Sequence, residues 1–262
     1  MTDLSAHLTS LGLEFLAEEL PAVVGQAEKE SDGYEAFLAR ALGFEAAARQ
    51  KRRESILLRL AKFPEIKTLG GLDYAFNPSL DPRLINQLGE LRFLGEKENV
   101  LLLGPPGVAK THVAIALGVA ACQAGHKTYF TTLEEMMLRL SSAPPNGLSG
   151  RLRRYTSASL LIVDEVGYMP LSASEAHLFF QVISQRYQKG STIITSNRAV
   201  AEWGEYLSDA TLAGALLDRF LHRCHVLSLK GDSYRLKDKL DLVAGKQKRT
   251  TKRKNDSKSD GG

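Results

Sequence analysis

The chain has 262 residues, of which 44% are hydrophobic and 24% are charged, and its formal net charge is +4 at pH 7. A chain of this length and composition is typical of a globular protein with one α/β domain and a small second one. It contains no uninterrupted apolar run of about 18 residues and no basic stretch followed by an apolar one at its start, so we expect no membrane span, no secretory signal and a cytoplasmic location.

Residues 1–66 are predicted to be all-helical, because apolar side chains recur at near-helical spacing between residues 8 and 20 and between residues 34 and 60. The second of these segments carries a basic cluster of Lys51, Arg52 and Arg53. Such a cluster is usually the solvated face of a helix, but grouped cations also suit the phosphates of nucleic acid. Both interpretations stay open. We expect residues 1–66 to form a helical domain that binds DNA or a protein partner.

Residues 99–114, NVLLLGPPGVAKTHVA, contain the central motif of the chain. A short apolar strand runs into a glycine and proline turn, and then into Lys-Thr and an apolar-periodic helix. This order predicts a P-loop, in which backbone N–H groups and the N-terminus of the helix surround phosphate groups. Lys110 is expected to reach the β- and γ-phosphates of ATP, and Thr111 to place its hydroxyl on Mg²⁺. The expected nucleotide-binding residues are Gly104, Pro105, Pro106, Gly107, Val108, Ala109, Lys110, Thr111 and His112.

Ala109 departs from this motif, which has glycine directly before the lysine. A methyl group at this position is expected to crowd the phosphates or to strain a backbone conformation suited to glycine. Two interpretations follow, a functional nucleotide site and a P-loop with weakened nucleotide binding.

Between the P-loop and the next motif we predict a strand at residues 126–131, a helix at 133–140 and a loop at 141–150. A second basic group follows this loop and adds candidate DNA contacts: Arg151, Arg153 and Arg154.

Another apolar run, residues 160–163, ends in Asp164 and Glu165, 54 residues after Lys110. A buried strand of a parallel sheet delivers such carboxylates to its carboxyl end, where ligands bind. Asp164 is expected to hold Mg²⁺, directly or through water, and Glu165 to act as the general base for the attacking water.

Three further groups are candidates for the same chemistry. Asn197 follows a β-branched strand and is placed to orient water beside the γ-phosphate. Arg219 or Arg223, near the end of a predicted helix, is a candidate for an arginine supplied to a neighbouring subunit. Arg235 is a candidate for contacting the γ-phosphate within its own chain. Residues 246–262 carry seven Lys or Arg and two Asp and are predicted to be a disordered basic tail.

The strings GPPGVAKTH, LLIVDEVGYMPLS, STIITSNR and LLDRFLHRCHVLSLKGDSYRLK follow in this order, and together they resemble an AAA+ ATPase. The resemblance is closer to IstB, the helper ATPase of insertion elements and a relative of the helicase loader DnaC. It implies an α/β fold, an AAA+ P-loop core with a parallel sheet flanked by helices, over residues 67–245, beside a small all-helical N-terminal domain.

The same resemblance assigns roles to individual residues. Lys110 and Thr111 match Walker A, Asp164 and Glu165 match Walker B, and Asn197 matches sensor 1. Arg219 best matches the arginine finger, with Arg223 as the alternative, and Arg235 aligns with the sensor 2 arginine. The implied protein is an ATPase that uses ATP and Mg²⁺, forms a homo-oligomer with ATP sites between subunits, binds duplex DNA and recruits a transposase.

Three other functions compete with this one. The same core would serve a helicase loader, whose first 66 residues would bind a replicative helicase. A P-loop kinase for a small metabolite would need an acceptor pocket and a lid, whereas the chain offers a helical domain instead. A nucleotide-binding scaffold without turnover is suggested by Ala109 and opposed by the intact Glu165.

Overall fold

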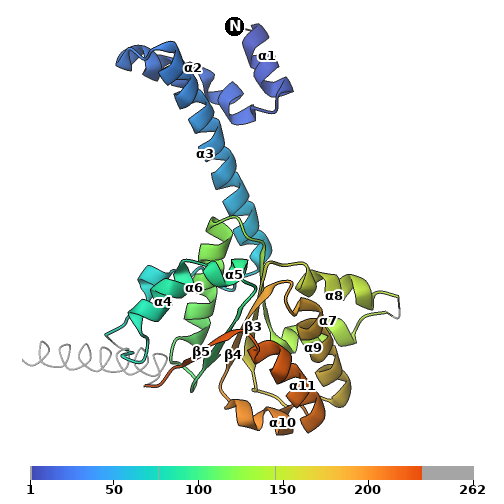
Figure 1. Ribbon diagram of the computed structural model, residues 1–262. Coiled ribbons are helices and arrows are strands. Elements are labelled where there is room, and N and C mark those ends of the chain that lie inside the picture. The colour runs from blue at the N-terminus through green and yellow to red at the C-terminus, as the bar shows by residue number, and fades with distance from the viewer. Residues whose placement is uncertain (1, 76, 145, 232–262) are drawn as a thin grey trace, which may run out of the picture.

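The computed structural model describes residues 2–75, 77–144 and 146–231 of the chain (Figure 1). Arg235 and the basic tail at residues 246–262 therefore lie outside the described residues. The strands are β1 Asn99–Leu103, β2 Thr128–Thr132, β3 Leu160–Val166, β4 Ser191–Ser196 and β5 Cys224–Ser228. The helices are α1 Thr2–Ser10, α2 Glu14–Glu30, α3 Tyr34–Ala61, α4 Pro82–Gly89, α5 Arg92–Gly95, α6 Lys110–Gln123, α7 Leu133–Ser141, α8 Leu148–Thr156, α9 Ala173–Arg186, α10 Trp203–Tyr206 and α11 Ala210–Leu221, with 3-10 turns η1 Leu69–Gly71 and η2 Val200–Glu202.

The strands form one five-stranded parallel sheet in the order β2-β3-β4-β1-β5. Successive apolar residues along a strand belong in turn to two hydrophobic clusters, one on each face of the sheet. Both faces of the sheet are therefore buried. One cluster includes side chains of α7, α9, α10 and α11, and the other includes α4, α5 and α6. Since β4 lies between β1 and β3, the P-loop strand and the carboxylate strand flank the strand that precedes Asn197.

The helices α1 and α2 stand apart from the sheet (Figure 1). α3 projects from the α/β core and carries α1 and α2 at its far end (Figure 1). A small apolar cluster around Leu16, Val23 and Ala41 joins α2 to α3. The helical character expected for this region is confirmed. Among the described residues, no helix is both long enough and apolar enough to cross a bilayer.

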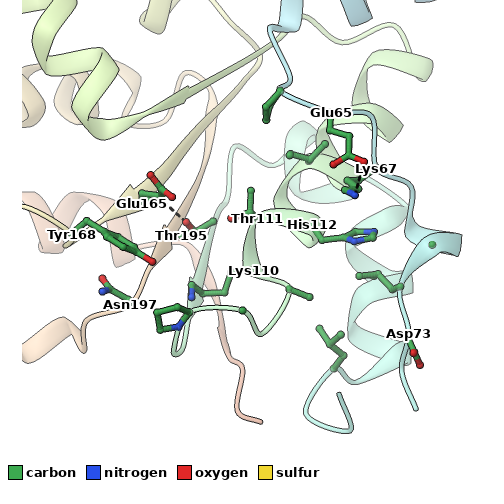
Figure 2. Close-up of a pocket in the computed structure, with 18 residues that line it drawn as sticks. Glu65, Lys67, Asp73, Lys110, Thr111, His112, Glu165, Tyr168, Thr195 and Asn197 are labelled. Atoms are coloured by element: carbon green, nitrogen blue, oxygen red, sulfur yellow. Dashed lines mark hydrogen bonds and ion pairs between the residues drawn. The ribbon is translucent and has the colours of Figure 1, made fainter. Parts of the chain in front are cut away.

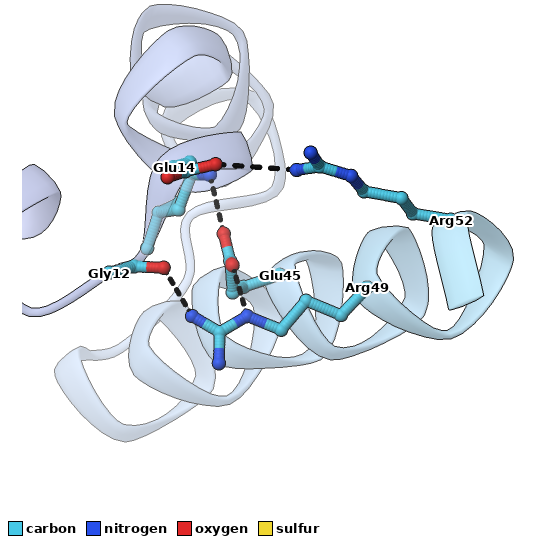
Figure 3. A network of polar contacts seen from close by, with 6 residues as sticks. Gly12, Glu14, Glu45, Arg49 and Arg52 are labelled. Carbon is cyan, nitrogen blue, oxygen red and sulfur yellow. Dashed lines mark hydrogen bonds and ion pairs between the residues drawn. The ribbon is translucent and has the colours of Figure 1, made fainter. Parts of the chain in front are cut away.

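A polar network fixes the start of α2 on α3 (Figure 3). The buried carboxylate of Glu45 accepts a hydrogen bond from the N–H of Leu16 at 2.8 Å and pairs with Arg49 at 2.6 Å. Burial alone would raise the pKa of Glu45, but these two donors hold the pKa below its ordinary value. The guanidinium of Arg49 also donates to the carbonyl of Gly12, and Arg52 pairs with Glu14 at 3.3 Å.

The loop predicted at residues 141–150 is shorter in the structure, because α8 begins at Leu148. Leu152 and Tyr155 are buried on one face of α8. Burial of this apolar face stabilises the helix even though serine and glycine lie in its first turn. The three arginines of this region therefore lie on a helix.

Candidate nucleotide-binding site

A pocket of about 530 Å³ lies where β1, β3 and β4 end (Figure 2). Ligands of parallel α/β sheets bind at this edge, beyond the carboxyl ends of the strands. Three stretches of chain line the pocket: the P-loop with α6, the ends of β3 and β4 with the residues that follow them, and the segment between α3 and α4. The lining residues are Pro64, Glu65, Lys67, Gly71, Leu72, Asp73, Leu80, Pro106, Gly107, Ala109, Lys110, Thr111, His112, Ile115, Glu165, Tyr168, Thr195 and Asn197.

The P-loop backbone takes conformations that glycine adopts most easily. Gly104 has φ +147°, and a side chain there would collide with the carbonyl oxygen of Leu229. Gly107 has φ +87°. Val108 is fully buried in the hydrophobic cluster that also includes side chains of α4, α5 and α6, so it anchors the loop to the core. The sequence between β1 and α6 therefore folds into the turn that a phosphate-binding loop requires.

Ala109 adopts φ +70° and ψ +14° immediately before α6, in the left-handed region where a methyl group is strained. The strain expected from the sequence is thus present in the backbone. We expect Ala109→Gly to raise the free energy of unfolding by about 0.5–1 kcal/mol, since relief of this strain outweighs the extra chain entropy of glycine. Urea denaturation of both proteins measures the difference. An unchanged or lower stability would show that the loop tolerates the methyl group without cost.

Lys110 is buried, and its ammonium group donates to the carbonyl oxygens of Gly104 and Pro105, both at 2.7 Å. These contacts place a positive charge within the curve of the loop (Figure 2). The first turn of α6 directs its own N–H groups toward the same region. The electrostatics of this end of the pocket therefore suit the phosphate groups of a nucleotide.

The two carboxylates at the end of β3 have different surroundings. Asp164 is buried and accepts hydrogen bonds from the hydroxyl of Thr111, at 3.0 Å to each carboxylate oxygen, and from the hydroxyl of Thr195. Glu165 is exposed at the pocket, and its N–H donates to the hydroxyl oxygen of Thr195 at 3.0 Å. Thr111 and Asp164 form the hydroxyl and carboxylate pair that holds Mg²⁺ in P-loop proteins, so the donor set fits that ion.

Thr195 had no predicted role in the sequence. As the fifth residue of β4 it lies between Asp164 and the backbone of Glu165, and it fixes both carboxylate residues at once. Its position in a β-branched strand was the only available signal, and that signal is also typical of a buried core threonine.

Asn197 lines the same pocket, one residue beyond the end of β4. Its side-chain oxygen is buried and, within the described part of the chain, accepts no hydrogen bond. A buried acceptor without a donor is costly, and it marks a position where a water or a ligand group completes the bonding. Beside Lys110, the pocket thus offers an acceptor for an ordered water molecule (Figure 2).

The remaining wall of the pocket comes from the segment after α3. Pro64, Glu65 and Lys67 line it, and the last two form an ion pair of 2.8 Å. His112, on the first turn of α6, contacts the carbonyl oxygen of Thr68 at 3.1 Å through Nε2. This segment carries no motif of its own, so the sequence gives no signal that it lines the pocket.

A family model described as IstB-like ATP binding protein matches residues 6–242. The chain belongs to this family. The ATP-binding protein of insertion sequence IS21 from Pseudomonas aeruginosa is 43% identical over 240 residues, which cover 91% of each chain. The corresponding protein of insertion sequence IS5376 from Geobacillus stearothermophilus is 42% identical over 230 residues, covering 87% of this chain and 92% of the relative. The family predicted from the motifs is confirmed.

The fold of this IstB-like chain is also found among solved structures. The crystal structure of DnaI aligns with a TM-score of 0.53 at 16% identity, covering 67% of this chain and 93% of DnaI. At this identity the likeness shows the fold alone. It agrees with the predicted core, a parallel sheet flanked by helices.

The two candidate trans arginines of this IstB-like chain lie away from the pocket. The carbonyl oxygens of Phe220 and Arg223 accept hydrogen bonds from Asn99, the first residue of β1, both at 2.8 Å. Arg219 lies one helical step earlier, stacks on Phe180 and donates to the carbonyl of Ala215 at 3.1 Å. The end of α11 is therefore at the amino edge of the sheet, whereas the P-loop follows the carboxyl edge.

The candidate DNA contacts form two groups, on α3 and on α8. Several of these side chains make contacts within the chain. Arg52 pairs with Glu14, Arg53 donates to the carbonyl of Gly125 at 3.1 Å, and Arg151 donates to the hydroxyl of Ser142 at 2.8 Å. Lys51, Arg153 and Arg154 are exposed. Sequence reasoning did not foresee that half of the set also holds helices in place.

Proposed function

We propose that this IstB-like protein hydrolyses ATP to ADP and phosphate in the pocket at the end of β1, β3 and β4. One observation carries the proposal. Thr111 and Asp164 are hydrogen-bonded to each other beside Lys110, and Glu165 and Asn197 line the same pocket. A charged P-loop, a Mg²⁺-binding pair and a carboxylate base are the parts that ATP hydrolysis needs.

Each residue has one task in this mechanism. Lys110 moves from the carbonyls of its own loop to the phosphates, and the P-loop N–H groups hold the phosphate chain. Thr111 and Asp164 would hold Mg²⁺, which would supply positive charge against the phosphates. Glu165 accepts a proton from the attacking water, and Asn197 orients that water through its free side-chain oxygen. Thr195 keeps Asp164 and Glu165 in position.

The described chain contributes no arginine to its pocket lining, although charge builds up on the transferred phosphoryl group. We propose that Arg219 of a neighbouring subunit supplies this charge, with Arg223 as the alternative, and that ATP sites lie between subunits of a homo-oligomer. The position of both residues at the opposite edge of the sheet supports a trans role. Arg235 is proposed to contact the γ-phosphate in its own chain.

The insertion-sequence relatives support a role in transposition. We propose that the oligomer binds duplex DNA through the exposed cations of α3 and α8 and recruits the transposase of its element. ATP hydrolysis then limits the lifetime of the assembly. The test is ATP hydrolysis by the purified protein at a stated salt concentration, with and without long duplex DNA. Faster turnover with duplex supports the proposal, and equal rates with and without DNA contradict its DNA part.

Mixing two inactive variants tests the trans arginine. We expect Arg219→Ala and Glu165→Gln each to lose most hydrolysis, the first by roughly 1,000-fold. The Arg219→Ala chain keeps Glu165, and the Glu165→Gln chain keeps Arg219. In a mixed oligomer, some sites between subunits therefore combine an intact Glu165 with an intact Arg219. The mixture should therefore hydrolyse ATP faster than either variant alone, as measured by phosphate release. Arg223→Ala mixed with Glu165→Gln tests the alternative residue, and no recovery in either mixture would contradict a trans arginine.

A further inference from the structure

Asn77 is a buried polar residue that no motif of the chain includes. It is 1% exposed and lies in the turn between η1 and α4, far in sequence from the P-loop. Its side-chain amide donates a hydrogen bond to the carbonyl oxygen of Val108 at 3.1 Å. This carbonyl belongs to the P-loop itself, one residue before the strained Ala109.

The other end of the Asn77 side chain is bonded as well. Its oxygen accepts hydrogen bonds from the N–H of Ser79 at 3.1 Å and from the hydroxyl of Ser79 at 2.6 Å. The Ser79 hydroxyl is also within 2.8 Å of both the N–H and the carbonyl oxygen of Lys230. Asn77 and Ser79 thus connect the P-loop to the chain that leaves β5.

The P-loop touches this exit segment at a second point. Gly104 lies so close to the carbonyl oxygen of Leu229 that no side chain fits between them. The N–H of Leu229 donates to the carbonyl of Leu103 at 2.7 Å. The first and the last part of the loop are therefore both held against residues 229–230, once by close backbone packing and once through Asn77.

We propose that Asn77 is a positioning residue for the nucleotide site. By holding the carbonyl of Val108, it fixes the orientation of the peptide that leads into Ala109, so that the loop N–H groups face the phosphates. A peptide that flipped would turn a carbonyl oxygen toward the phosphates instead of an N–H, and anions repel such an oxygen. The methyl group of Ala109 makes this support necessary, because the alanine does not adopt its left-handed conformation without cost.

This inference rests on the proposed nucleotide site, and its test uses binding rather than turnover. We expect Asn77→Asp to weaken binding of a fluorescent ADP analogue to the full-length protein by about tenfold or more. The aspartate has the same shape and keeps the Ser79 contacts, but it places an oxygen against the Val108 carbonyl where the amide donated. Arg83→Ala, at an exposed position on the neighbouring α4, is the matched control and should bind like the wild type.

Three further variants separate positioning from folding. Asn77→Asp combined with Ala109→Gly should recover part of the lost affinity, because glycine lowers the cost of the loop conformation. Ser79→Ala should weaken binding less than Asn77→Asp, and its effect should not add to that of Asn77→Asp in a double variant if the two side chains act as one unit. Thermal unfolding of each variant shows whether the fold is intact.

The outcomes distinguish the two proposals. Wild-type protein that binds the analogue, together with an Asn77→Asp variant of equal affinity, would overturn the role of Asn77 and leave the nucleotide site standing. Asn77→Asp and the double variant Asn77→Asp with Ala109→Gly could instead lose affinity equally and lose thermal stability in parallel. That result would show that Asn77 acts in folding and not in positioning the loop. Absence of binding by the wild type would overturn both proposals.

Discussion

Replacing Glu165 by glutamine is expected to lower the turnover number for ATP hydrolysis by at least about 100-fold while nucleotide affinity stays within about threefold of wild type. Glutamine keeps the size of the side chain and the hydrogen bond from its backbone N–H to Thr195, so the strand end is preserved. It removes only the group that accepts a proton from water. Phosphate release measures turnover, and equilibrium binding of an ADP analogue measures affinity.

Glu134→Gln is the matched control for this variant. Glu134 is an exposed glutamate on α7, so its replacement changes the net charge by the same amount at a position outside the pocket. We expect wild-type turnover from it. A Glu165→Gln protein that turns over at more than about a tenth of the wild-type rate would assign the proton transfer to another group.

Replacing Arg186 by methionine is expected to lower the free energy of unfolding by about 3–5 kcal/mol, the largest stability change we predict. Arg186 is 2% exposed. Its guanidinium donates to the carbonyl oxygens of Tyr155 and Ala158 at 2.7 and 2.9 Å and to the hydroxyl of Thr192 at 2.9 Å. Burial lowers the pKa of Arg186 to about 10, so the side chain stays charged at pH 7.

The reason for this large effect is that one side chain satisfies several buried acceptors at the amino ends of β3 and β4. Methionine fills the volume but leaves these acceptors without donors, and each costs about 1–3 kcal/mol. Arg186→Lys keeps the charge but lacks the planar guanidinium. Its free energy of unfolding should lie between those of the wild type and Arg186→Met. Arg153→Met, at an exposed arginine, is the control. Urea denaturation measures all four proteins, and a loss below about 1 kcal/mol for Arg186→Met would show that water replaces the guanidinium.

The sequence predicted those parts of the site that local pattern determines. β1 with its P-loop, β3 with Asp164 and β4 leading to Asn197 each combine an apolar run with a polar end, and the strand order then brings the three ends together. The core fold was predictable for the same reason, because buried parallel strands are recognisable as continuous apolar segments.

Residues that act across long sequence separations were not predictable in this way. Asn77 meets Val108 only after the turn before α4 folds back on the P-loop, and Arg186 finds its acceptors in two stretches of chain, one at Tyr155 and Ala158 and one at Thr192. Thr195 bridges to Asp164 through the register of β4 beside β3. An asparagine in a turn, an arginine near a helix end and a threonine in a strand are each common, so their types alone carry no signal.

The helix α3 joins the N-terminal helices directly to the wall of the nucleotide pocket. It has 28 residues, which correspond to a length of about 42 Å at the usual rise, and Pro64 of the pocket follows its end almost at once. The C-terminal part of α3 is held on the core, because Gln50 donates to the carbonyl of Gln123 at 3.2 Å and Arg53 to the carbonyl of Gly125 at 3.1 Å. The part that projects beyond these contacts, residues 34–49, is about 24 Å long. A tilt of about 10° where it leaves the core would carry its far end through about 4 Å, so a small change at the core is magnified at the tip of the arm.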